Sequence, residues 1–324
     1  MEVLTLPDSN KLQISNPSSG NLSFITANTT ISTMRELKDK HLIPVFVKDN
    51  QPVISQADFV DLTGDIVKHI FPKEDIIQPL LRVSHPIKGR IPDAKDKPAH
   101  LLTEEEKTIY FERMAFIMEI PSISEDINGN RLSLTIGGIK AYNLDNLYSR
   151  KGAEEHFKIF IGFQNKVCTN LCISTDGFKS DLRVRSINEL TDAIYSIIEN
   201  YNAKLHLDQL QQLTKHSLTE HQFAQLIGRA RMYQHLPPKH KKHLQELNFG
   251  DTQLGMVVKD YYNDDAFCRD EDGSINIWKL YNLFTGANKT SYIDTFLDRG
   301  LNAYTFINSI SSAVAKKESS WFLN

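Results

Sequence analysis

The sequence has few cysteines and no long apolar run. Three cysteines are too few, and odd in number, to build a framework of disulfide bonds. No apolar stretch approaches the roughly 20 residues that a membrane-spanning helix needs. The N-terminal residues MEVLTLPDSNKLQIS lack the basic start and apolar stretch of a secretory signal. From these absences we expect a cytoplasmic protein in a reducing compartment, without membrane contact.

An excess of positive charge is also absent. The chain has 37 Lys and Arg against 40 Asp and Glu, which gives a net charge of −3. This balance excludes a protein that coats nucleic acid with its whole surface. Any contact with nucleic acid must therefore depend on a local group of cations.

The motifs of common enzymes and cofactor-binding proteins are missing. Neither the glycine-rich dinucleotide pattern nor the nucleophile elbow of serine hydrolases occurs. The pair His240 and His243 lacks the Glu of a metalloprotease motif. The acidic run at 270–273 lacks the remaining ligands of a calcium loop. The sequence predicts no catalytic residue, no metal site and no cofactor, and an enzyme of another type stays as an alternative.

What is present is a change of pattern along the chain. Residues 1–35 are rich in Ser, Asn and Thr and predict a flexible N-terminal arm. Residues 36–187 contain apolar runs typical of strands, residues 188–317 repeat apolar residues at helical spacing, and residues 318–324 form a tail. Successive strands with short connections favour an antiparallel or mixed sheet. We therefore expect an α+β fold, with a β-rich N-terminal half followed by an α-helical C-terminal half.

Turn and cap residues predict individual elements. A hairpin is expected over 44–54, and Ser55 is expected to cap the helix that follows it. The apolar strand at 114–120 is expected to end at Pro121, and the Asn-Gly pair at 128–129 is typical of a hairpin turn. Further strands are predicted at 131–136, 157–163 and 182–185, and further helices from 186 and at 205–216, 219–236, 239–247, 252–263, 275–284 and 291–317.

The stretch WKLYNLFTGANKTSYIDTFLDR at 278–299 begins and ends as an apolar helix, with a polar insert between the two halves. One interpretation is a helix break, in which Gly286 ends the first helix and Thr290 or Ser291 caps the next. The alternative is that free N–H groups at the start of the second helix bind an anion. The candidate contacts in that case are Asn288, Lys289 and Tyr292.

The densest group of cations in the N-terminal half lies at 82–92, in the sequence RVSHPIKGRIP. Two prolines and one glycine give this predicted loop a defined shape, and Arg suits bidentate contact with phosphate. The alternative is a rigid surface connection with solvated charges. Arg183 and Arg185 alternate along a predicted strand, where they could follow a nucleic-acid backbone or pair with carboxylates. Within 82–92, the candidate phosphate contacts are Arg82, His85, Lys88 and Arg90.

Five stretches are long and unusual enough to indicate a family. They are RVSHPIKGRIPDA (82–94), EKTIYFERMAFIMEIPSI (106–123), GGIKAYNLDNLY (137–148), VCTNLCISTDG (167–177) and the stretch at 278–299. In this order they resemble a family of uncharacterised proteins carried on conjugative and other mobile elements. More distantly, a Cys-x-Asn segment, an Arg-x-Arg strand and an Asn-x-x-Thr helix resemble a phage/plasmid-like family of unknown function.

The resemblance implies a role in handling the DNA of a mobile element, because family members are encoded beside genes for DNA transfer and replication. Our first hypothesis is a non-enzymatic accessory protein that binds single-stranded or duplex DNA through the candidate contacts named above. This hypothesis requires those residues to share one face. The alternative is a scaffolding role, with self-assembly into oligomers or contact with other mobile-element proteins, which requires a large exposed apolar patch on the helical half.

Overall fold

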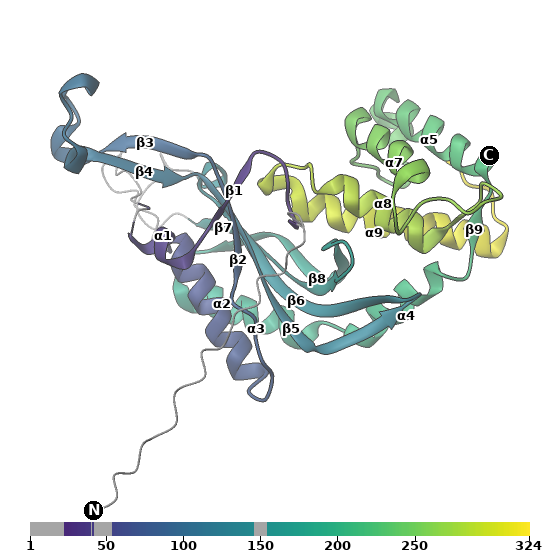
Figure 1. Cartoon of the computed structure of the whole chain (residues 1–324), viewed down its shortest axis with the longest axis horizontal. Helices are drawn as coiled ribbons and strands as arrows, with labels where there is room; N and C mark the ends of the chain where they lie inside the picture. Colours follow the sequence, from purple (N-terminus) through teal and green to yellow (C-terminus); the bar gives the residue numbers. More distant parts are fainter. Residues whose placement is uncertain (1–22, 40, 42–53, 146–153) are drawn as a thin grey trace, which may run out of the picture.

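The structure is a computed structural model that describes residues 23–39, 41, 54–145 and 154–324. Strands dominate its N-terminal half and helices its C-terminal half, so the predicted α+β class is confirmed (Figure 1). The hairpin predicted at 44–54 and most of the predicted N-terminal arm lie outside the described residues. Within this description, no helix is both long and apolar enough to cross a bilayer.

A six-stranded antiparallel sheet forms the centre of the N-terminal half. Its strands are β1 (Thr29–Ser32), β2 (Leu80–Ser84), β5 (Arg113–Ile127), β6 (Asn130–Ala141), β7 (Glu155–Asn165) and β8 (Leu171–Val184). They lie in the order β1-β2-β5-β6-β7-β8, so β1 and β8 are the two edges. The antiparallel pairing agrees with the prediction from successive strands.

The predicted turn between β5 and β6 is confirmed. Asn128 and Gly129 both have positive φ, 52° and 75°, which is the backbone that a two-residue type I′ hairpin requires. The prediction that the strand ends at Pro121 was wrong. β5 continues to Ile127 because a bulge between Ile120 and Ser124 takes up the proline without ending the pairing with β6.

The cationic segment at 82–92 was predicted as a loop, and the structure corrects this. Only His85 separates β2 from β3 (Pro86–Arg90), which pairs with β4 (Lys107–Phe111). These two strands form a two-stranded arm that extends away from the main sheet (Figure 1). Alternation of polar and apolar residues over only five positions gave too short a signal to distinguish a strand from a loop.

Both faces of the sheet are covered. On one face lie α2 (Gln56–Ile70) and α3 (Ile187–Asn200), where the Phe59 ring packs edge-on against Phe116 and Phe157. On the other face lies the start of α9 (Ile293–Lys316), which packs in one cluster with Ile117 and other inward residues of the sheet. Coverage of both faces explains the continuous apolar run in β5. Ser55 caps α2 as predicted and forms a capping box.

The C-terminal half consists of helices packed around buried aromatic side chains, including Trp278 and Tyr281. The prediction of a helix over 239–247 was wrong in length. The helix begins at Pro238, directly after Pro237, and contains only four residues. In addition to α3 and α9, the helices are α4 (Ala203–Leu213), α5 (Glu220–His235), α6 (Pro238–Lys241), α7 (Asp251–Asn263) and α8 (Ile277–Asn288), and α1 (Met34–Asp39) precedes them in the N-terminal half. The short strands β9 (Ser217–Leu218) and β10 (Ile275–Asn276) pair with each other.

The break between α8 and α9 exists, but its details differ from the prediction. Gly286 lies inside α8, which continues to Asn288, and its φ is not positive. The residue before α9 is Tyr292, whose side chain makes no capping hydrogen bond. Gly286 therefore does not act as the left-handed cap that the prediction required.

Candidate anion-binding cavity

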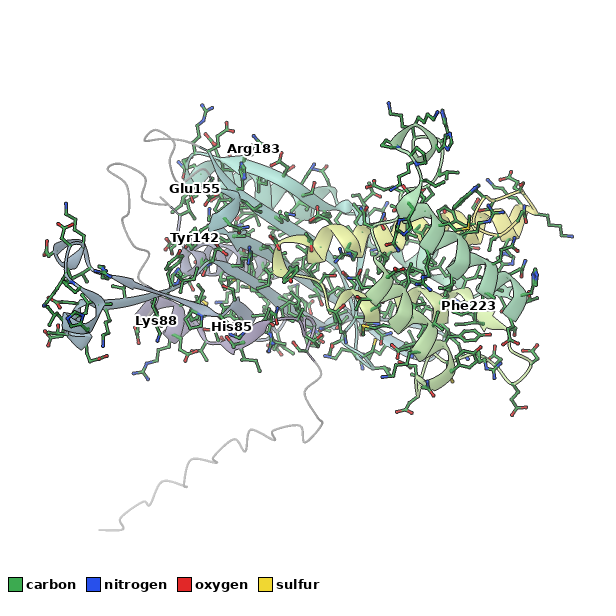
Figure 2. The ribbon with its side chains drawn as sticks, turned by 90° about the horizontal axis from the view of Figure 1, so that it is seen from above. His85, Lys88, Tyr142, Glu155, Arg183 and Phe223 are labelled. Carbon is green, nitrogen blue, oxygen red and sulfur yellow. The ribbon has the colours of Figure 1, made fainter. Side chains whose placement is uncertain are left out.

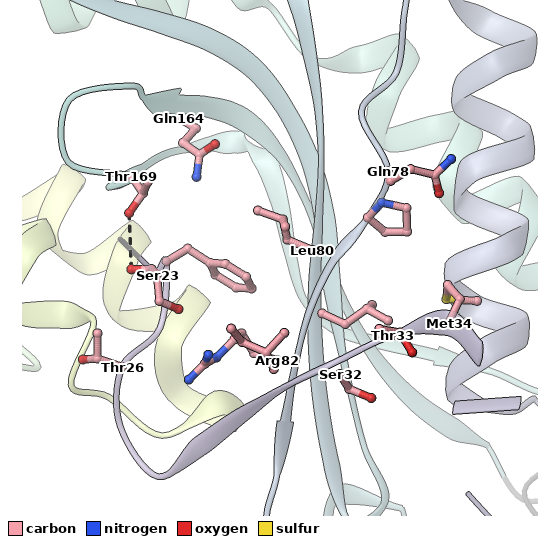
Figure 3. Close-up of a pocket in the computed structure, with 14 residues that line it drawn as sticks. Ser23, Thr26, Ser32, Thr33, Met34, Gln78, Leu80, Arg82, Gln164 and Thr169 are labelled. Atoms are coloured by element: carbon pink, nitrogen blue, oxygen red, sulfur yellow. Dashed lines mark hydrogen bonds between the residues drawn. The ribbon is translucent and has the colours of Figure 1, made fainter. Parts of the chain in front are cut away.

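A cavity of about 630 Å³ lies between residues 23–34, strand β2 and the turn that joins β7 to β8 (Figure 3). This volume is in the range of pockets that bind small ligands, roughly 300–1,000 Å³. Its walls are mixed, which allows both apolar and polar contacts. The apolar lining includes Phe24, Ile31, Met34 and Leu80. The polar lining includes Ser23, Thr26, Arg82, Gln164 and Thr169.

The segment at 23–34 is held at both ends, which gives the cavity a defined wall. Phe24 and Ile25 are buried in the apolar cluster beneath α9. The backbone N–H of Thr26 donates to the carbonyl of Lys289 at 2.8 Å. Further along, β1 pairs with β2. The polar composition of 1–35 predicted none of this, because the anchoring depends on contacts with residues far along the chain, on β2 and at Lys289.

Arg82 is the predicted contact residue that lines this cavity. Its Nε donates to the hydroxyl of Thr29 at 2.9 Å, and its Nη2 donates to the carbonyl of Thr29 at 2.8 Å. Within the described part of the chain, no carboxylate pairs with Arg82, and Nη1 has no hydrogen-bond partner. Partial burial lowers the pKa of the guanidinium. A half-buried cation with unused N–H donors favours an anion as its missing partner.

Gln164 is a lining residue that the sequence analysis did not identify. It is only 3% exposed, yet its side-chain amide has no hydrogen-bond partner among the described residues. Figure 3 shows this amide pointing into the space between the β7–β8 turn and Leu80, with Arg82 on the far side. The amide is not among the buried polar atoms that lack a partner, so its polar atoms reach the space of the cavity and are open to a ligand. The only sequence signal was a polar residue that extends the alternating run at 157–163.

A second, smaller cavity lies on the other side of Arg82. It has a volume of about 220 Å³ and is lined by Thr29, His85, Arg113 and Tyr292, among others. The ring of Tyr292 is 60% exposed. Arg113 is neutralised here, because its guanidinium lies 3.3 Å from Glu112 and 3.4 Å from Asp294. Three predicted residues, Arg82, His85 and Tyr292, therefore come together around the segment at 26–29.

Lys88 and Arg90 lie on the two-stranded arm. Lys88 is exposed and has no partner among the residues described. The guanidinium of Arg90 instead donates to the carbonyls of Lys95 and Lys97 at the tip of the arm. The stretch 86–111 contains five Lys or Arg and five Asp or Glu, and its acidic residues pair with several of these cations. The arm as a whole therefore carries no excess positive charge.

Arg183 and Arg185 do not join this group. Arg183 belongs to the end of β8 and Arg185 lies just beyond it, and β5, β6 and β7 separate that strand from β2. Four strand spacings correspond to on the order of 19 Å. Figure 2 shows Arg183 on the opposite side from His85 and Lys88. Arg183 pairs with Asp181 at 3.0 Å and Arg185 with Glu154 at 2.9 Å, so pairing with carboxylates is the observed alternative.

Asn288 is buried and Lys289 is half-buried, and both have protein partners. The amide of Asn288 donates to the carbonyl of Phe296 at 2.9 Å. The ammonium of Lys289 donates to the carbonyl of Cys168 and to the hydroxyl of Thr169 at 3.0 Å, and burial lowers its pKa. These bonds position Thr169 in the wall of the larger cavity. The geometry thus gives both residues a supporting role. The nine candidate contacts taken together do not share one face, which the first hypothesis required.

The fold and the cavity define an α+β protein with a ligand-sized site between a sheet and an N-terminal segment. The chain belongs to the family described as "Domain of unknown function, B. Theta Gene description (DUF3871)", whose model matches residues 10–323. No curated protein and no solved structure matches the chain. Membership of an uncharacterised family is therefore confirmed, and the link to mobile elements and to the phage/plasmid-like family stays a prediction.

Proposed function

We propose that this protein is a non-enzymatic accessory protein of a mobile element and that it binds single-stranded nucleic acid. The observation that carries the proposal is Arg82, a half-buried cation without a carboxylate partner among the described residues, which lines a cavity open to ligands. A phosphate is a suitable partner because it accepts several charge-assisted hydrogen bonds from one guanidinium.

The residues near Arg82 favour a nucleic-acid strand as the ligand, rather than an isolated anion. His85 and Lys88 follow along the chain after Arg82, both exposed and both without a partner in the described structure. Consecutive positions along an extended strand rise by about 3.3 Å, so a flexible single strand that binds Arg82 can also reach His85 and Lys88. The exposed ring of Tyr292 offers a surface on which a base could stack.

Net charge limits the kind of binding that we expect. A chain with a charge of −3 attracts a polyanion only where cations gather locally. We therefore expect few phosphate contacts, on the order of two or three. The logarithm of the binding constant should then fall with the logarithm of salt concentration with a slope of about −1.5 to −2, given about −0.7 per contact for single strands.

Fluorescence anisotropy of a labelled single-stranded oligonucleotide, titrated at several salt concentrations, tests the proposal. The variant Lys88→Ala combined with Tyr292→Ala should weaken binding, and both positions are exposed, so folding should be retained. Arg183→Ala combined with Arg185→Ala is the matched control, because it removes two cations at the opposite edge of the sheet. Absence of binding at low salt, or equal losses in both double variants, would refute the proposed surface.

A further inference from the structure

We propose that the 630 Å³ cavity holds one whole nucleotide, with its phosphate at Arg82 and the hydrogen-bonding edge of its base at Gln164. This inference rests on the proposed function, and it goes further by assigning the base a pocket of its own. The ligand class is a nucleoside monophosphate unit, either within a strand or free in solution.

The polar groups of the cavity match the two ends of a nucleotide. Nη1 of Arg82 supplies N–H donors for the phosphate at one side. Across the cavity, the amide of Gln164 supplies an N–H donor and a carbonyl acceptor next to each other. Base edges present the same adjacent donor and acceptor pattern, which is why Asn and Gln amides pair with them. An inorganic anion alone would leave the Gln164 amide unsatisfied.

The apolar walls suit the faces of a base and sugar. Phe24 forms part of the lining close to the core and is only 4% exposed. At the mouth, Ile31 is 69% exposed and Leu80 is 56% exposed. Exposed side chains of this size are unfavourable in water, and a sugar and base entering the cavity would cover them. The cavity therefore combines apolar walls with two separated polar ends.

The frame of the cavity is rigid enough for such a site. Thr169, beside Gln164, donates to the carbonyl of Ser23 at 3.2 Å and accepts from Lys289 at 3.0 Å. Arg82 is bound to Thr29 on the opposite wall. These contacts fix the separation of the two polar ends before a ligand arrives, which reduces the ordering that binding requires.

The test compares a single-stranded oligonucleotide with an abasic oligonucleotide of equal length, which keeps the phosphates and lacks the bases. For the wild-type protein we expect the abasic strand to bind roughly 10-fold more weakly or worse, since contacts with one base contribute about 5- to 150-fold. Salt-dependent binding that is equal for both strands would overturn the inference and leave the proposed function intact.

Gln164→Met tests the assigned residue. We expect this variant to bind the abasic strand like the wild type and to lose the preference for bases. Gln212→Met, at an exposed position on α4 outside the cavity, is the matched control and should keep that preference. Far-UV circular dichroism checks that both variants fold. A retained preference in a folded Gln164→Met protein would overturn the assignment.

Thymidine monophosphate alone distinguishes a free nucleotide from a nucleotide within a strand. If the site serves free nucleotides, this compound raises the melting temperature of the wild type and not of Gln164→Met, while no oligonucleotide binds. That outcome supports the cavity and refutes the proposed strand binding. If neither the free nucleotide nor the bases of a strand affect binding or stability, the inference is wrong.

Discussion

Acidification should destabilise the protein in part through a buried histidine, His206 on α4. Its ring is 1% exposed, and its Nδ1 lies 2.8 Å from the hydroxyl of Tyr201, while its Nε2 is buried without a partner in the described structure. Burial lowers the pKa of His206 to about 4, from an ordinary value of 6.5. The neutral ring is therefore the form that the folded protein holds.

The sign and size of the effect follow from this difference. The unfolded chain binds the proton at a higher pH than the folded protein does, so stability is complete above pH 6.5 and is lost as pH falls toward 4. Between pH 7.5 and 4.5 this one site should remove about 2.5 kcal/mol of the free energy of unfolding, since each pKa unit corresponds to about 1.36 kcal/mol.

The variant His206→Asn isolates this contribution from other groups that titrate. We expect it to be less stable than the wild type at pH 7.5, because ring contacts with Phe163 and Tyr304 are lost. The difference in the free energy of unfolding between the wild type and His206→Asn should be smaller by about 2.5 kcal/mol at pH 4.5 than at pH 7.5. Urea unfolding at a series of pH values measures both curves, with His221→Asn at an exposed position of α5 as the control. Parallel curves for the wild type and His206→Asn would refute the reasoning.

Three further predictions concern stability. The ammonium of Lys140 is fully buried and lies 2.8 Å from an oxygen of both Asp145 and Glu155, so Lys140→Met removes a buried cation that two carboxylates share. We expect a loss of about 3–5 kcal/mol in chemical denaturation, and a loss below about 1 kcal/mol would contradict the buried pairing. A Cβ on Gly138 would lie 2.6 Å from a backbone oxygen, so Gly138→Ala should lower the melting temperature by several degrees. Gly228→Ala, in an exposed helical position with open space around it, should instead stabilise by about 0.5–1 kcal/mol.

Local patterns in the sequence predicted those elements that depend on residues close together along the chain. The cap at Ser55 and the turn at 128–129 depend on residues a few positions apart, so they could be read directly. The antiparallel sheet followed from successive strands with short connections. Helix boundaries were less accurate, as at Gly286, where α8 continues to Asn288 because the glycine does not adopt the positive φ of a helix cap.

The candidate site was only partly predictable. Arg82 was identified because cations are dense in its segment, but Gln164 was not, since a single Gln in a strand carries no signal of its own. Arg183 and Lys289 show the opposite error. Both looked available in the sequence, and both have protein partners in the structure. Whether a cation is free depends on which carboxylates and carbonyls the fold brings to it: Asp181 is two positions from Arg183, whereas Cys168 is 121 positions from Lys289.

The sequence by itself determined the fold class, the main strands and helices of each half, and membership of an uncharacterised family, because these depend on periodicity, turn residues and long characteristic stretches. Only the tertiary structure decided that residues 23–34, β2 and the β7–β8 turn enclose one cavity. It brings Arg82 and Gln164 to opposite sides of that space although 82 positions separate them. The reason is physical: a binding site is a property of side chains that meet across strands, and sheet order sets those meetings.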